Sequence, residues 1–201
     1  MRTVKAVNSA LVMLMLASSA IGDESRRLRG DFAYTGSAIC VNSGANFATT
    51  PPTPPLGFAN FAPIGPSFVS SNSVQGTVTF NGNGTGSMVQ QFVSLGNPGA
   101  ASVQDTTNEF TYSVAADGTL TIDIGPSFST TVAGSGAGGQ SIVTDVPTFI
   151  GRLSSDGKSL TFATSTAAVE TVTRVVPAPE LVTALRICHR TRIGIRINKE
   201  D

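Results

Sequence analysis

Histidine, cysteine and tryptophan are scarce in this sequence, and their scarcity excludes several kinds of site. The 201 residues include one His, two Cys and no Trp. So few imidazoles and thiols cannot build a zinc site made only of Cys and His, a four-cysteine iron–sulfur cluster, or an acid–base constellation that needs several histidines. Charged residues are also few, at 13% of the chain, and 13 basic residues balance 13 acidic ones. We therefore expect no cofactor and no metal.

One short apolar run near the start of the chain predicts export. Arg2 and Lys5 precede the eight apolar residues Ala10 to Ala17, and Ser18-Ser19-Ala20 follows. This order is typical of a signal peptide, whereas a membrane-spanning helix needs about 20 apolar residues. We expect residues 1–20 to be cleaved near Ala20, leaving a single domain over 21–201 without a membrane span. The protein would then be secreted or periplasmic.

The rest of the chain has the alternation of a β protein. Apolar and polar residues alternate over Val74 to Asn81, Glu109 to Val114 and Thr119 to Ile124, which indicates antiparallel strands with one wet face. No segment has a convincing helical period. Seven further strands are expected: Asp31 to Val41, Thr85 to Leu95, Phe128 to Ala133, Thr148 to Ser154, Ser159 to Ser165, Ala168 to Val175 and Thr183 to Ile197.

Two Asp-Gly turns fix strand registers. A three-residue loop at Ala116-Asp117-Gly118, with a left-handed Gly118, pairs Val114 with Leu120 and keeps apolar residues on one face. At Asp156-Gly157 a two-residue turn instead pairs Leu153 with Leu160. Both choices follow from keeping the apolar residues of paired strands on the same side.

A Pro-rich segment, residues 51–66, interrupts the strands. Prolines at this density cannot donate to a sheet ladder, so we predict a long connection and not a central strand. Phe58 and Phe61 lie within it and are expected to pack onto the domain. Connections of this length often act as lids or binding loops, although a docked loop with no such role is an equal alternative.

The two cysteines bear on how the sheet closes. Cys40 lies on the first expected strand and Cys188 on the last, and an oxidising compartment favours a disulfide between them. Such a bond would make the two ends of the sheet neighbours, as a closed β-barrel requires. The sequence therefore predicts an all-β antiparallel meander closing into a barrel, with a β-sandwich as the alternative.

Several strand and hairpin segments resemble the small secreted barrels of the lipocalin-like (calycin) kind. These are Gly30-Asp31-Phe32-Ala33-Tyr34, Gly76 to Phe80, Asp117 to Ile122 and Asp156 to Phe162. The Gly-x-Trp motif of lipocalins has no counterpart here. The resemblance implies a cavity for a small, largely apolar ligand, and a barrel of this size can hold one. The candidate lining residues are Phe32, Tyr34, Phe58, Phe61, Tyr112 and His189.

Positive charge is concentrated on the last strand, in Arg186, Arg190, Arg192 and Arg196. These arginines all lie at even-numbered positions and so on one face of the strand, whereas His189 lies on the other face with three isoleucines. The alternation predicts the arginines on the solvent face and His189 inside, as a core residue and not a general base. The alternative is an anion-binding site, because guanidinium groups bind carboxylate and phosphate bidentately.

Three functions remain compatible with this pattern. The first is an exported, non-enzymatic barrel that binds a small apolar ligand or a partner surface. The others are an adhesive or structural β-sandwich without a cavity, and a cyclase or isomerase acting at a barrel mouth. Nucleic acid is not an expected partner: loss of Arg2 and Lys5 leaves 11 basic against 13 acidic residues, a net charge of −2.

Overall fold

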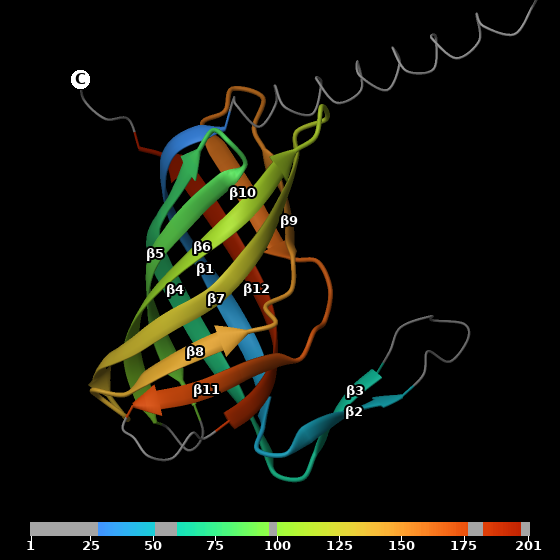
Figure 1. Ribbon diagram of the computed structural model, residues 1–201, viewed down its shortest axis with the longest axis vertical. Helices are drawn as coiled ribbons and strands as arrows, with labels where there is room; N and C mark the ends of the chain where they lie inside the picture. Colours follow the sequence, from blue (N-terminus) through green and yellow to red (C-terminus); the bar gives the residue numbers. More distant parts are fainter. Residues whose placement is uncertain (1–27, 51–59, 97–99, 177–182, 198–201) are drawn as a thin grey trace, which may run out of the picture.

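The chain folds into β-strands. The computed structural model describes residues 28–50, 60–96, 100–176 and 183–197 (Figure 1), so the expected signal peptide and Phe58 lie outside the described residues. No helix occurs in these ranges, and therefore no helix there is long and apolar enough to cross a membrane. The all-β prediction is confirmed. The strands are β1 (Arg29–Ser43), β2 (Asn46–Thr50), β3 (Asn60–Ile64), β4 (Ser67–Asn81), β5 (Thr85–Leu95), β6 (Ala101–Val114), β7 (Thr119–Gly134), β8 (Gln140–Thr144), β9 (Phe149–Leu153), β10 (Ser159–Thr164), β11 (Glu170–Val176) and β12 (Thr183–Arg196).

Eight of these strands close into a hydrogen-bonded ring. Their order is β1-β4-β5-β6-β7-β8-β11-β12, all pairs are antiparallel, and β12 pairs back with β1. Near the start of β7 and the end of β12, the pair β9 and β10 takes the place of β8 and β11. Figure 1 shows these two pairs one above the other. The ring is thus completed at two levels by different short strands.

A disulfide joins the first and last strands of the ring. Cys40 of β1 and Cys188 of β12 are direct partners in the antiparallel register, and their sulfurs are bonded. Both predictions, the pairing of the two cysteines and the adjacency of the sheet ends, are confirmed. The bond is consistent with an extracellular or periplasmic location.

The predicted turn registers are confirmed as well. Val114 pairs with Leu120 across a loop in which Gly118 has a φ of 81°, and Leu153 pairs with Leu160. The alternation did not reveal β2, β3 and β8, nor the first halves of β4 and β6. The first halves of β4 and β6 are rich in Ser, Thr, Asn and Gln, the short strands β2 and β8 show no clear alternation, and β3 contains Pro63.

The Pro-rich segment is only in part a connection. Residues 60–64 form β3, which pairs with β2 in a separate two-stranded sheet that projects from the ring in Figure 1. The predicted loop therefore contains a strand at these five residues, although this strand is not a central one. A two-stranded sheet leaves one edge of each strand free, so Pro63 can be accommodated without an amide proton.

The inside of the ring is divided into an apolar half and a polar half. Along β6 the same inward face carries Gln104, Thr106 and Asn108 and then changes to Phe110 and Tyr112. Phe80 lies at the centre of the apolar half, with ring centroids 5.3 Å from Phe110 and 4.9 Å from Tyr112. This half is a continuous packed core, which supplies most of the apolar burial of the fold.

Candidate functional site

A cavity of about 290 Å³ occupies the polar half of the ring. Hydroxyl and amide side chains of β4 to β7 form much of its wall, and Met88, Phe92, Phe149 and Phe162 contribute apolar surface. The lining continues to Gly96 and Ala100 at the β5–β6 connection and to Ser135 at the β7–β8 connection. The cavity therefore reaches the end of the ring that lies opposite the packed apolar half.

The structure does not place around the cavity the residues expected to bind an apolar ligand. Phe32, Tyr34 and Tyr112 are buried in the packed apolar half and do not line the cavity. Burial raises the pKa of Tyr34 far above its usual value of 10.0, so it remains a neutral phenol. Phe61 lies on β3, outside the ring, and His189 is exposed on the outer face of β12.

The expected orientation of the last strand is wrong. Arg190 and Arg192 are only 6% and 4% exposed, whereas His189, Ile193 and Ile195 are on the outside. The prediction assumed that the apolar parity faces inward. Here the inward parity is the charged one, because Glu170 provides a carboxylate partner for Arg186 and Arg190 inside the ring.

Arg186 and Arg196 are also turned from the expected solvent face, and both are partly buried. Arg186 lines the cavity together with Arg190 and Arg192. Arg196 lies at the other end of β12, where its guanidinium carbon is 4.9 Å from the centroid of the Phe32 ring. The four arginines therefore lie in different surroundings: three of them line the cavity, and Arg196 does not.

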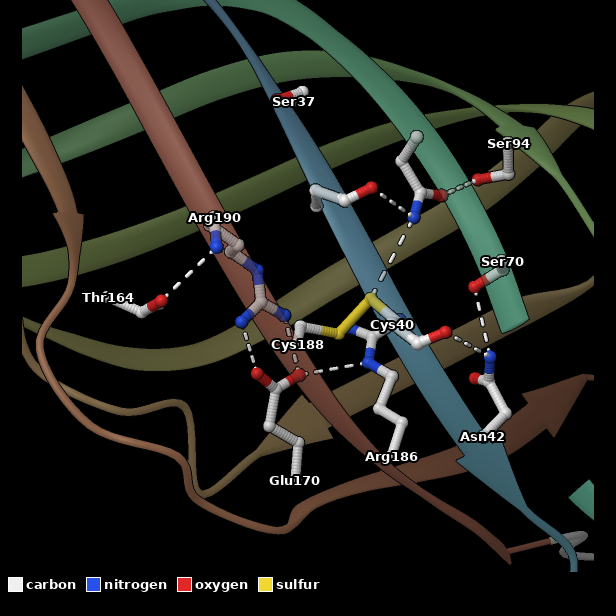
Figure 2. Close-up of a disulfide and its surroundings, with 12 residues drawn as sticks. Ser37, Cys40, Asn42, Ser70, Ser94, Thr164, Glu170, Arg186, Cys188 and Arg190 are labelled. Carbon is white, nitrogen blue, oxygen red and sulfur yellow. Dashed lines mark hydrogen bonds and ion pairs between the residues drawn. A yellow bond between two sulfur atoms is a disulfide. The ribbon is translucent and has the colours of Figure 1, made fainter. Parts of the chain in front are cut away.

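Glu170, the first residue of β11, is completely buried between two of these arginines (Figure 2). The Arg186 Nε donates to Glu170 Oε2 at 2.9 Å, and the Arg190 Nη2 donates to the same oxygen at 2.6 Å. The Arg190 Nη1 donates to Oε1, so Arg190 binds the carboxylate bidentately. The Arg190 amide also donates to Thr164 Oγ1 at 3.1 Å.

Ionisation of Glu170 is maintained by these contacts. Burial alone would raise the pKa of its carboxyl, but the hydrogen bond from Arg190 and the charges of Arg186 and Arg190 lower the pKa below its ordinary value of 4.5. Sequence reasoning missed this residue. Glu170 lies two residues before the apolar Val172 and so shares its face of β11, and β11 pairs with the arginine-rich β12. This pattern could have identified Glu170.

Arg192 has no carboxylate partner among the described residues. Its Nη1 donates to the backbone oxygens of Ser37 and Thr191, each at 2.8 Å, and its guanidinium carbon lies 5.9 Å from the centroid of the Phe92 ring. Burial lowers the pKa of Arg192 to about 10, which leaves it charged at neutral pH. This arginine therefore places an unbalanced positive charge on the cavity wall.

Amide side chains complete the wall beside the disulfide. Asn72 accepts a hydrogen bond from Ser94 Oγ, and its Nδ2 approaches Cys40 Sγ at 3.8 Å. Asn42 donates to Ser70 Oγ at 3.0 Å, as Figure 2 shows. These contacts fix the amides across β1, β4 and β5, so this side of the cavity is preorganised.

The chemistry available here is recognition by hydrogen bonds and positive charge. The only imidazole is outside the ring, and no group of three or more His, Cys, Asp and Glu residues in the described ranges is arranged to hold a metal ion. Comparison with known proteins gives no match: no family model fits the chain, and neither a curated protein nor a solved structure matches it.

Proposed function

We propose that this chain is an exported, non-enzymatic binding protein that encloses a small molecule in the polar half of a lipocalin-like barrel. The observation that carries the proposal is the cavity of about 290 Å³ inside the closed ring of strands. Its size falls near the lower limit of typical small-molecule sites. The packed apolar half holds the scaffold rigid while the other half is hollow.

The lining favours a ligand with both polar and apolar parts over a largely apolar one. Buried hydroxyl, amide and guanidinium groups lose their hydration, so a ligand must replace those hydrogen bonds. Phe92 and Met88 offer apolar contact in the same space. A small polar organic molecule satisfies both surfaces.

Catalysis at a barrel mouth has less support than binding. A buried carboxyl with a raised pKa in the cavity would favour an acid–base enzyme. The pKa of Glu170 is lowered instead, because two arginines hold the carboxylate in its charged form. His189 faces away from the cavity. An adhesive module without a cavity is less compatible with the hollow half of the ring.

Blocking the cavity is expected to abolish binding. Thr106 and Thr107 are neighbours on β6, with Thr106 buried at the cavity wall and Thr107 exposed. Thr106→Phe would fill the space with a ring, whereas Thr107→Phe adds the same ring outside. Calorimetric titration with benzoate and with benzamide should detect binding of at least one of them to the wild type and to Thr107→Phe, but none to Thr106→Phe.

Two results of that titration would contradict the proposed function. The first is that neither benzoate nor benzamide binds to the wild-type protein. The second is that Thr106→Phe, shown by circular dichroism to be folded, binds the probe as well as Thr107→Phe does. Because the two variants carry the same substitution on opposite faces of one strand, a general effect of added bulk appears in both.

Export is tested independently of binding. Intact-mass measurement of the protein recovered from its producing organism should give a chain that begins at Ile21 or Asp23. Cleavage there follows from the small residues that end the predicted signal peptide. A recovered chain that retains Met1 to Ala20 would refute export.

A further inference from the structure

We propose that the ligand is a small organic carboxylate, and that its carboxylate group binds the free edge of the Arg192 guanidinium. This inference rests on the proposed function, because it assigns the ligand class of the same cavity. It names one anchoring residue and one chemical group on the ligand.

Arg192 has two unused donors beside the cavity. Only its Nη1 donates to described residues, and neither Nε nor Nη2 forms a hydrogen bond with them. The side chain is nevertheless 4% exposed and lines the cavity. The Nε and Nη2 protons form one edge of the planar guanidinium, and that edge matches the two oxygens of a carboxylate.

Local backbone geometry holds this arginine in place. Gly36 of β1 is the direct partner of Arg192 on β12. A Cβ atom at Gly36 would lie 2.8 Å from the Arg192 Cδ and 2.0 Å from the Thr191 oxygen. The absence of a side chain at this position lets Arg192 cross β1 and reach the Ser37 oxygen. The guanidinium is therefore preorganised before any ligand arrives.

The charge balance of the cavity calls for an anion. Three arginines line it, and Glu170, the one carboxylate next to them in the described part of the chain, is already bound by Arg186 and Arg190. A buried charge without a partner is costly, and an anionic ligand would provide the missing negative charge at Arg192.

Neighbouring groups favour an organic anion over an inorganic one. Phe92 lies beside the guanidinium, and Asn108 lines the cavity with a buried carbonyl oxygen that has no hydrogen-bond partner among the described residues. A bare anion would use neither group. A ligand with an apolar body and a hydroxyl or amine donor would use both.

Charge selectivity tests the inference. Benzoate and benzamide have nearly the same shape, but only benzoate is ionised at neutral pH. Calorimetric titration should show that wild-type protein binds benzoate at least about 30-fold more tightly than benzamide, because a desolvated charge pair is lost with the amide. The preference should disappear in Arg192→Met. It should persist in the control Arg152→Met, since Arg152 is an exposed residue of β9 paired only with exposed Asp117.

Each outcome decides between the proposals. Equal binding of both compounds to the wild type would overturn the carboxylate inference and leave the proposed function standing, whereas binding of neither would overturn the proposed function. Inorganic phosphate that binds as tightly as benzoate would overturn the organic part of the inference. Arg192→Met should fold, since it removes a charge that has no carboxylate partner among the described residues. If it does not fold, Arg192→Lys tests the anchoring residue instead. Arg192→Lys keeps the charge without the fork, so it should bind benzoate about tenfold more weakly than the wild type.

Discussion

The variant Glu170→Ala is expected to lose about 3 to 5 kcal/mol of unfolding free energy. Glu170 is fully buried and is the only described carboxylate that contacts Arg186 and Arg190. Its removal leaves two neighbouring guanidinium groups without the carboxylate that binds them both, so they repel each other. Urea unfolding at neutral pH, followed by circular dichroism, measures the loss.

A matched control isolates the effect of burial. Glu109→Ala makes the same substitution on the outer face of β6, where the side chain is exposed. Its unfolding free energy should stay within about 0.5 kcal/mol of the wild type. If Glu170→Ala also changes stability by less than about 1 kcal/mol, the description of the buried pair as a tightly coupled unit is wrong.

The same carboxylate makes stability sensitive to acid. Because the folded pKa of Glu170 is below its ordinary value of 4.5, the charged form contributes stability above that value. The contribution is lost as pH falls through the folded pKa, since the native state must then take up a proton that breaks the pair. The difference in stability between wild type and Glu170→Ala should therefore shrink on acidification below about pH 4.

The double variant Cys40→Ala with Cys188→Ala is expected to lose about 5 kcal/mol of unfolding free energy. The disulfide closes a loop with a sequence separation of 148 residues, so it removes much freedom from the unfolded chain. A loss of this size approaches the whole stability of many domains. Urea unfolding at low temperature compares the double variant with the oxidised wild type.

Reduction provides the control for that comparison. Dithiothreitol should lower the stability of the wild type by a similar amount and should have no effect on the double variant, which has no sulfur to reduce at either position. A reduced wild type as stable as the oxidised protein would mean that the seam between β1 and β12 is held by its twelve paired positions alone.

Local pattern was sufficient for the strands and turns but not for the site. The register at Leu153 and Leu160 follows from a short turn and two apolar residues, so the sequence predicted it. Which face of β12 turns inward, however, depends on the side chains that the ring encloses. Arg190 faces inward because Glu170, 20 residues away in sequence, neutralises it there, and no rule about apolar parity contains that information.

The polar lining of the candidate cavity was missed for a related physical reason. Its lining residues, such as Gln104 and Thr106, occupy the same face of β6 as the core residue Phe110. When only one strand is considered, polar residues indicate a face exposed to solvent, even where that face in fact turns inward. The lipocalin-like resemblance suggested a hollow interior, but it implied an apolar cavity lined by residues such as Phe32 and Tyr112.

The division of the ring into two halves also affects how this protein can change over generations. Truncation of Phe80 or Phe110 to Ala removes packed apolar volume and costs about 3 to 5 kcal/mol, a large part of the stability of a typical domain. Exchange of one hydroxyl or amide for another at the cavity wall disturbs far less packing. Mutation can therefore alter what is recognised in one half while selection for foldedness acts mainly on the other. The scaffold is in this sense evolvable, because its specificity and its stability depend on different positions of the same strands.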